Sequence, residues 1–380
     1  MDIHCRLLFS GMALTVLMFT GFCVAAADVS ASQIDSIFSS VTSKTEPGLA
    51  VLVRKGGQTV FERGYGMRDL RSDLPIDVHT NFRLASCSKQ FTATAIMLLV
   101  HDGKLHYEDR LTDIFPEFPA YGKEITIRNL LNHTAGLQSY EEALRKKYPD
   151  TDWENIPQIQ DEGVLAIMEE QTGTKFPPGS KWEYSNGGYE LLANVVRKVS
   201  GEPFEDFLRQ RIFEPLRMDH TLVYKYGKNK VVDRAYGYTK NANVWLETDQ
   251  SPTSATLGDG AVYTSVDDLI KWDDALRNHT LLSQPEFQPA ITPAAASEGA
   301  VDPRNPQEGY GFGWFLNSYR GHPRMWHTGE TIGFLAVIER FPEDNLTIVV
   351  LANRTDLNPK DLAQKVADLY FPESGKARQN

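Results

Sequence analysis

Strand-forming sequence lies near both ends of this 380-residue chain, and this separation strongly constrains how the chain can fold. Near the start, two β-rich runs at residues 48–54 and 58–65 flank Lys55, Gly56 and Gly57, which is typical of a hairpin. Near the end, Pro342 to Asn345 is expected to be a turn, and four further runs have strand character: 310–317, 324–329, 334–341 and 346–353. The pattern predicts one α/β unit that is interrupted by an insertion.

Helical patterns dominate the region between these runs. Residues from about 105 to 250 are expected to form helices and long loops, and strands are expected only later. The pattern of apolar residues predicts three further helices, at 89–101, 266–278 and 359–371. No helix is expected before Ser86. Because the chain has no internal repeat and no linker, we predict one domain over 28–375 with a helical subdomain at about 105–250.

The first 27 residues have the pattern of a secretory signal peptide. Arg6 precedes an apolar run from Leu7 to Val24, and small residues follow at Ala25 and Ala27. Polar and glycine residues interrupt the run, which favours cleavage over the alternative of a retained membrane anchor. We therefore expect a secreted or periplasmic protein without stable membrane insertion after cleavage.

Composition narrows the possible partners. The formal net charge of −11 makes nucleic-acid binding unfavourable, because that binding depends on basic surfaces. Removal of residues 1–27 would leave Cys87 as the one cysteine, so no intramolecular disulfide is expected. The sequence has no metal-ligand spacing, no P-loop and no dinucleotide fingerprint, so we expect neither a metal nor a cofactor. The sequence leaves the oligomeric state open.

The segment FRLASCSKQFTA, residues 82–93, is the first candidate for chemistry. Lys89 follows Ser86 by three residues, so both side chains would lie on one face if a helix starts here. A serine hydroxyl is a weak nucleophile that needs a base, and burial lowers the pKa of a lysine enough to let it accept a proton. The alternative is a capping serine beside a solvated lysine.

Two further segments hold candidate residues. In KWEYSNGGYELL, Tyr184 and Asn186 would point the same way in an extended chain; the alternatives are a core aromatic and a turn residue. In RMWHTGETIGF, His327 and Thr328 lie on an expected strand, where a single histidine is more often structural. Gly329 would permit the close approach of a ligand.

These three motifs, S-x-x-K, Y-x-N and H-T-G, occur in the order that resembles the serine β-lactamase and penicillin-binding protein superfamily. The Y-x-N form is similar to class C β-lactamases, DD-peptidases of the carboxypeptidase type and related esterases. The resemblance covers roughly residues 44–371. It implies an α/β (α+β) fold in which an antiparallel sheet is flanked by helices and carries an inserted all-helical subdomain.

The resemblance also implies roles. Ser86 would be the acylated nucleophile, Lys89 its proton partner, and Tyr184 the group that moves protons to the leaving group and from the deacylating water. Asn186 would hold a substrate amide.

At the H-T-G motif, His327 and Thr328 would help to bind a substrate carboxylate or relay a proton, next to Gly329. The backbone amides of Ser86 and Glu330 would form the oxyanion hole.

Many β-lactamases have a lysine at the position of His327, and a histidine near its ordinary pKa of ~6.5 is mostly neutral at pH 7. This difference favours a D-alanyl peptidase or esterase over a β-lactamase. We therefore expect an exported serine hydrolase that acts through an acyl-enzyme at Ser86 on a small-molecule or peptide substrate: a D-alanyl peptide, a β-lactam or a small ester. The alternative is a sensor of penicillin or peptidoglycan that is acylated without efficient turnover. Cys87 and His133 are interpreted as structural, and Asp259 as a loop residue without an assigned role.

Overall fold

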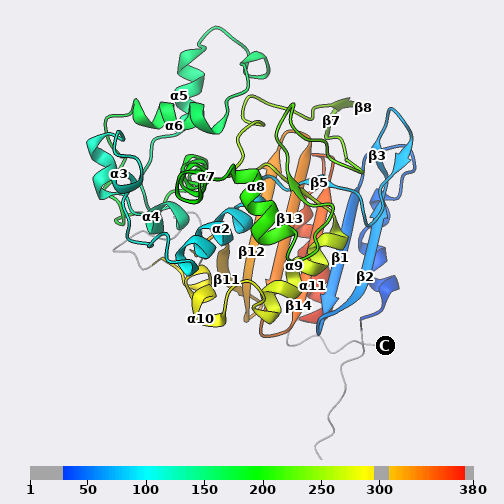
Figure 1. Cartoon of the computed structure of the whole chain (residues 1–380). Coiled ribbons are helices and arrows are strands. Elements are labelled where there is room, and N and C mark those ends of the chain that lie inside the picture. Colours follow the sequence, from blue (N-terminus) through cyan, green and yellow to red (C-terminus); the bar gives the residue numbers. More distant parts are fainter. Residues whose placement is uncertain (1–28, 295–307, 373–380) are drawn as a thin grey trace, which may run out of the picture.

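A seven-stranded antiparallel sheet brings the two ends of the chain together (Figure 1). The computed structural model describes residues 29–294 and 308–372, so the predicted signal peptide lies outside the described residues. Along the sheet the strands are β10 (Gly309–Tyr310), β11 (Phe315–Tyr319), β12 (His322–Thr331), β13 (Phe334–Phe341), β14 (Leu346–Ala352), β1 (Leu49–Lys55) and β2 (Gln58–Tyr65). The predicted hairpin β1–β2 pairs with the last strand from Leu49↔Ala352 to Lys55↔Leu346.

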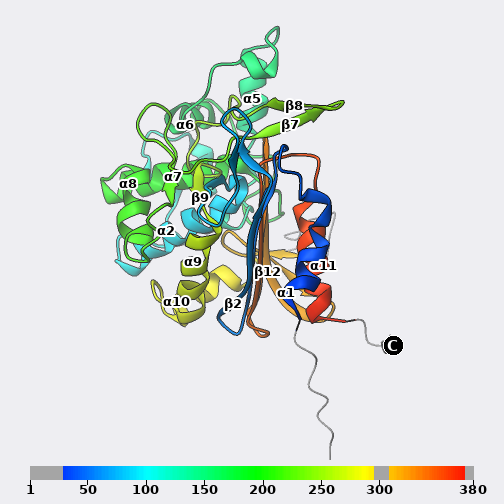
Figure 2. The same cartoon turned by 90° about the vertical axis from the view of Figure 1, so that its right-hand side faces the viewer.

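Both faces of this sheet are covered. Helices α1 (Ala31–Ile37) and α11 (Pro359–Tyr370) lie on one face, and the remaining helices lie on the other (Figure 2). Successive residues of β1 alternate between the two cores, since Val51 packs on the α1–α11 side and Leu52 on the opposite side. Two buried faces explain why the central strands β1 and β14 are mostly continuous apolar runs in the sequence.

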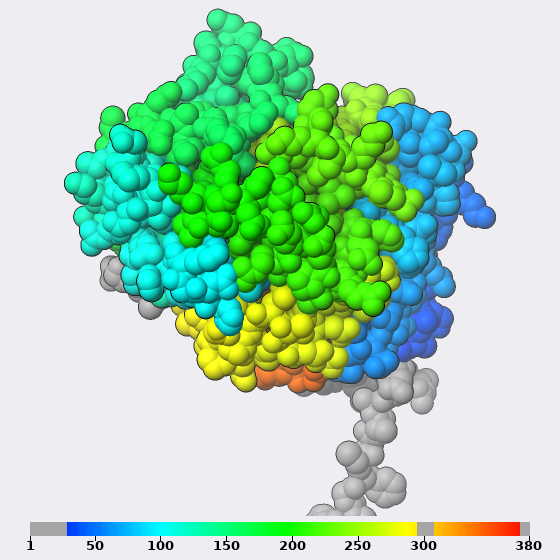
Figure 3. Space-filling model, viewed as in Figure 1, coloured from blue at the N-terminus to red at the C-terminus, as the bar shows by residue number. Residues whose placement is uncertain are grey.

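The helical region lies across the larger core. Its central helix α2 (Lys89–His101) is buried over most of its length and follows a short 3₁₀ turn, η2 (Ala85–Ser88). The other helices on this side are α3 (Leu111–Ile114), α4 (Ile127–Leu131), α5 (Tyr140–Lys147), α6 (Asp161–Glu169), α7 (Asn186–Ser200), α8 (Phe204–Leu208), α9 (Val266–Asn278) and α10 (Gln284–Phe287). In the space-filling view they hide most of the sheet (Figure 3).

The fold confirms the predicted antiparallel sheet flanked by helices, but several local predictions are wrong. Helix α1 precedes Ser86, and its start is encoded by a capping box in which Ser30 and Gln33 bond reciprocally. The predicted strand 310–317 is two strands separated by a turn at Gly313, whose φ is 77°. Within the described residues, no helix combines the length and apolar character needed to cross a membrane.

Short strands also occur within residues 105–250, which were expected to be helices and loops, and just after this region. They are β6 (Leu222–Val223), β7 (Tyr238–Asn241), β8 (Val244–Glu247) and β9 (Val262–Thr264). Strand β9 lies between β6 and β5 (Phe82–Arg83), while β3 (Met67–Asp69) pairs with β4 (Leu74–Pro75). Strands of two to four residues are too short to show a period in the sequence, which explains why they were missed.

Candidate active site

The backbone is strained immediately before Ser86. Ala85 has a φ of 47°, in the left-handed region that residues with a side chain seldom adopt. The segment is held by neighbouring backbone, because Leu84 N–H donates to the Val262 carbonyl at 2.9 Å and Cys87 N–H donates to the Leu84 carbonyl at 3.1 Å. Of the four residues in η2, only Ser86 is not buried. Such strain concentrates at functional sites, where the surrounding structure maintains it.

Lys89 is the first residue of α2 and is fully buried. Its Nζ lies 3.0 Å from Ser86 Oγ, 2.9 Å from Asn186 Oδ1 and 3.2 Å from the Asp259 carbonyl oxygen. Burial lowers the pKa of Lys89 below its ordinary value, although the nearby carboxylates, led by Asp259, act in the opposite direction. A lowered pKa increases the fraction of neutral amine, which is the form that accepts a proton from a serine.

Tyr184 and Asn186 reach the site from the start of α7. Ser185 is the N-cap between them, with an extended backbone (φ −139°, ψ 113°) and a side chain that accepts a hydrogen bond from Gly188 N–H. Lys89 Nζ lies 4.9 Å from the centroid of the Tyr184 ring. The Tyr184 hydroxyl is buried without a hydrogen-bond partner among the described residues. Burial raises the pKa of Tyr184 well above its ordinary value, with Ser86 acting against it, so this phenol is neutral.

The free edge of β12 runs past the nucleophile. Strand β11 pairs with β12 only as far as Trp326, whereas β13 pairs with it through Thr331, so residues 327–331 have one edge without a partner strand among the described strands. A Cβ on Gly329 would lie 2.0 Å from the Leu84 carbonyl oxygen. The glycine was expected to admit a ligand; the space beside it is instead occupied by the chain's own backbone. This close approach places the edge of β12 against η2.

His327 lies on β12 and is buried. Its Nδ1 is 2.6 Å from the Thr328 carbonyl oxygen, which can only accept, so Nδ1 carries the proton and Nε2 accepts from the Tyr310 hydroxyl at 3.0 Å. Burial, with a smaller contribution from Lys89, lowers the pKa of His327 to about 3. His327 is therefore neutral at physiological pH and offers no positive charge to a substrate carboxylate.

Thr328 and Glu330 lie on one face of β12, and His327 lies on the opposite face, because successive residues of a strand point to opposite sides. Together with Gly329, Thr328 and Glu330 line a hollow of about 340 Å³ that also includes Asn358 and Lys360 at the start of α11. The roles of Thr328 and Glu330 in binding a substrate stay predictions.

Aromatic rings support the Tyr184 side of the site. The His133 ring lies 4.3 Å from the Tyr184 ring and 4.5 Å from the Tyr310 ring, measured between centroids. His133 Nδ1 accepts a hydrogen bond from Ser185 N–H at 3.2 Å, and burial lowers the pKa of His133 well below its ordinary value. These contacts agree with the interpretation of His133 as structural, and they show that it helps to position the Tyr184–Asn186 segment.

Cys87 also agrees with its interpretation as a structural residue. Its side chain is fully buried, and its thiol donates to the His327 carbonyl at 3.3 Å. Burial raises the pKa of this thiol well above its ordinary value, so it is not a thiolate at neutral pH.

Glu141 was not identified from the sequence. Its Oε1 accepts from Asn186 Nδ2 at 3.0 Å, and its Oε2 accepts from Ser139 Oγ at 2.8 Å. Both ends of the Asn186 amide are thus engaged, one with Lys89 and one with Glu141. A substrate amide would have to replace or share one of these bonds. The acidic first turn of α5 gives no sign in the sequence that one of its carboxylates reaches residue 186.

The loop that presents the Asp259 carbonyl to Lys89 is held by buried carboxyl groups. Glu190 accepts from the backbone N–H groups of Asp259 at 2.7 Å and Gly258 at 3.3 Å, and Asp161 accepts from Leu257 N–H at 2.8 Å. Burial raises the pKa of Asp161 to about 6 and that of Glu190 well above its ordinary value. Asp259, which had no assigned role, thus contacts Lys89 through its backbone. Among the described residues, no cluster of three or more His, Cys, Asp or Glu side chains could hold a metal ion.

The site combines three features: a serine in contact with a buried lysine, a tyrosine and an asparagine that both come from the start of one helix, and the edge of a strand beside them. Together they define the class of β-lactamase-fold serine hydrolases. Residues 34–370 match the family described as Beta-lactamase, and the chain belongs to this family. Among its relatives, Penicillin-binding protein 4* of Bacillus subtilis (strain 168) is 31% identical over 337 residues, which cover 85% of this chain and 72% of that protein.

Solved structures of related proteins have the same fold as this chain. The octameric penicillin-binding protein homologue from Pyrococcus abyssi superposes with a TM-score of 0.77 at 26% identity, covering 89% of this chain and 77% of that one. The D-amino acid amidase from Ochrobactrum anthropi SV3, complexed with L-phenylalanine amide, gives a TM-score of 0.73 at 25% identity and covers 89% and 96%. The predicted superfamily and fold class are both confirmed.

Proposed function

We propose that this protein hydrolyses an amide or an ester through an acyl-enzyme formed at Ser86. The observation that carries the proposal is the 3.0 Å contact between Lys89 Nζ and Ser86 Oγ, made by a fully buried lysine whose pKa is lowered. In the first step, neutral Lys89 takes the Ser86 proton while Oγ attacks the substrate carbonyl carbon. The backbone N–H groups of Ser86 and Glu330 stabilise the resulting oxyanion.

Collapse of the tetrahedral intermediate requires a proton for the leaving group. Tyr184 supplies it from its neutral phenol and regains a proton from the Lys89 ammonium, which restores both side chains to their starting forms. In the second step a water molecule gives a proton to the same Tyr184–Lys89 pair, and the water oxygen attacks the acyl carbon. Ser86 Oγ then leaves with that proton, and a carboxylic acid is released.

The charges at the site favour certain substrates. His327 is neutral, and the Glu141 carboxylate lies beside Asn186. Both features weaken the attraction for a substrate that carries a carboxylate close to its reacting bond, as β-lactam antibiotics do. A D-aminoacyl amide or a small ester, which carries no such carboxylate, is therefore the better candidate, with a D-alanyl peptide after them, and the similarity to a D-amino acid amidase supports the amide.

We also propose that the protein is exported, on the evidence of the pattern in residues 1–27. The contact of Lys89 with the nucleophile, and the Tyr184 ring next to Lys89, support turnover over a pure sensor, which needs no route for returning protons.

A substrate panel tests the activity. Steady-state hydrolysis of p-nitrophenyl esters, D-alanyl p-nitroanilide and nitrocefin is measured for wild type, Ser86→Ala and the neighbouring control Cys87→Ala. We expect ester or anilide turnover to exceed nitrocefin turnover in wild type, to be lost in Ser86→Ala and to survive in Cys87→Ala. Full activity in a folded Ser86→Ala protein would show that the proposal is wrong.

A further inference from the structure

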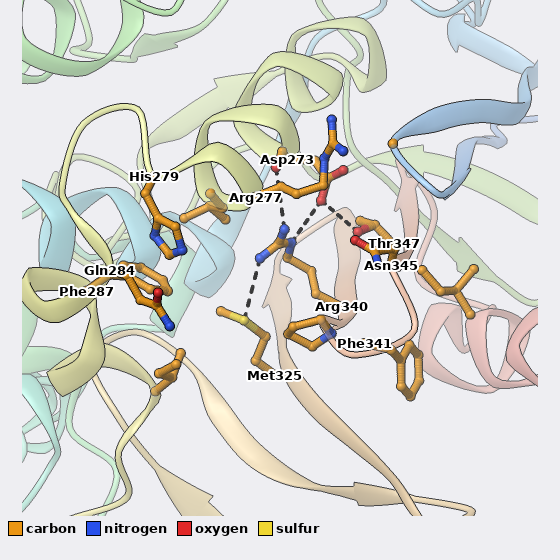
Figure 4. A pocket seen from close by; sticks show the side chains of 15 residues that line it. Asp273, Arg277, His279, Gln284, Phe287, Met325, Arg340, Phe341, Asn345 and Thr347 are labelled. Atoms are coloured by element: carbon orange, nitrogen blue, oxygen red, sulfur yellow. Dashed lines mark hydrogen bonds and ion pairs between the residues drawn. The ribbon is translucent and has the colours of Figure 1, made fainter.

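A second cavity lies outside the residues that form the acyl-enzyme site. It has a volume of about 270 Å³ and lies between α9, α10 and the turn from β13 to β14 (Figure 4). Its buried apolar wall consists of Leu276, Phe287 and Met325. A cavity of roughly 150 Å³ already accepts benzene, so this one has room for a small ring or a short alkyl chain together with a polar group.

A buried arginine reaches into this cavity. Arg340 is only 7% exposed, and Figure 4 shows its guanidinium between Asp273 and Met325. Its Nε donates to Asp273 Oδ1 at 2.9 Å and its Nη2 to the Asp273 carbonyl at a long 3.4 Å. Its Nη1 donates to Met325 Sδ at 3.6 Å. A thioether is a weak acceptor, so one edge of a buried cation is poorly satisfied.

Nearby carboxylates do not balance the positive charge. Asp273 Oδ2 also pairs with Arg54 at 2.6 Å, and Asp274 pairs with both Arg54 at 2.9 Å and Arg277 at 3.2 Å. Three guanidinium groups therefore share two carboxylates, and Asp273 is the only carboxylate among the described residues that line the cavity. A buried charge without a full complement of partners is costly, so an anion that enters here would be stabilised.

We propose that this cavity is a binding site for a small monocarboxylate with a compact apolar tail. The carboxylate accepts hydrogen bonds from the Nη1 edge of Arg340 in place of Met325 Sδ, and the tail packs against the apolar wall. One excess positive charge and a partly apolar lining match a single negative charge on a hydrocarbon better than a phosphate dianion, which needs more donors. The rim residues Arg277, His279, Gln284 and Asn345 are exposed, so the ligand can enter from solvent.

A ¹⁹F NMR titration of the mature full-length protein with 4-fluorobenzoate tests the proposal. We expect 4-fluorobenzoate to bind wild type saturably. Neutral 4-fluorobenzamide should bind wild type with an affinity lower by roughly tenfold or more, and 4-fluorobenzoate should bind Arg340→Met with a similarly reduced affinity. In both cases a charge-assisted hydrogen bond is lost. Arg340→Met leaves Asp273 paired with Arg54. The control Arg209→Met removes an exposed arginine elsewhere and should bind as wild type does.

Three results would overturn the proposal. They are the absence of saturable binding to wild type at millimolar ligand, equal affinity for the benzamide, and undiminished binding to folded Arg340→Met. If Arg340→Met does not fold, Ile291→Trp blocks the cavity while keeping the arginine, and binding that survives this change would also refute the site. Ser86→Ala should retain the binding; its loss there would place the ligand in the acyl-enzyme site instead.

Discussion

Replacing Lys89 by arginine isolates the role of this side chain as a proton acceptor. Arginine carries a positive charge and offers donors to the oxygens that Lys89 contacts on Ser86, Asn186 and Asp259. Its pKa above ~12 prevents it from accepting a proton at neutral pH. A positioned general base contributes about 10²–10⁴-fold, so acylation of Lys89→Arg should be slower by this factor, or about 3–5 kcal/mol in activation free energy.

Rapid-quench acylation by an activated ester measures this effect in wild type, Lys89→Arg, Lys89→Met and Lys104→Arg. Lys104 is exposed beyond the end of α2, so its variant should react as wild type does. The wild-type rate should rise with pH through the lowered pKa of Lys89, because only the neutral amine accepts the proton, and this rise should vanish in Lys89→Arg. A folded Lys89→Arg protein that acylates within about tenfold of wild type with the same pH profile would refute the assignment.

Three further changes have defined outcomes. The charge of Glu141 raises the pKa of Lys89, so Glu141→Gln should move the rise of the acylation rate to lower pH; an unchanged or higher midpoint would contradict this. Tyr184→Phe should lower kcat by about 10²-fold or more with little change in stability, and thermal unfolding with a hydrolysis assay checks both. Gly329→Ala would place a Cβ 2.0 Å from the Leu84 carbonyl, so its melting temperature and its activity should both fall; a wild-type melting curve would argue against that close approach.

The parts of the fold that follow from local pattern were predictable. The hairpin β1–β2, the strand β13 and the helix α9 were each expected from periodicity and turn residues, because these elements are long and their patterns are regular. Ser86 and Lys89 could be paired because they lie three residues apart at a helix start.

The remaining features depend on contacts between residues distant in the sequence. Glu141 reaches Asn186 across 45 positions, and the Leu84 carbonyl occupies the space beside Gly329. The pKa of His327 falls to about 3 because folding buries it, whereas the sequence alone suggested an ordinary value. Burial and long-range contact are properties of the assembled core, so no local pattern records them.

The measurement that tests the central claim most directly is time-resolved intact-protein mass spectrometry of wild type and Ser86→Ala, quenched after mixing with a p-nitrophenyl ester or a penicillin. The account predicts a transient mass increase equal to the acyl group in wild type with the ester, located by peptide mapping to Ser86 and absent from Ser86→Ala. A persistent penicillin adduct at Ser86 would identify slow deacylation. An equal adduct on Ser86→Ala, or ester turnover by wild type that never passes through an adduct on Ser86, would contradict the account.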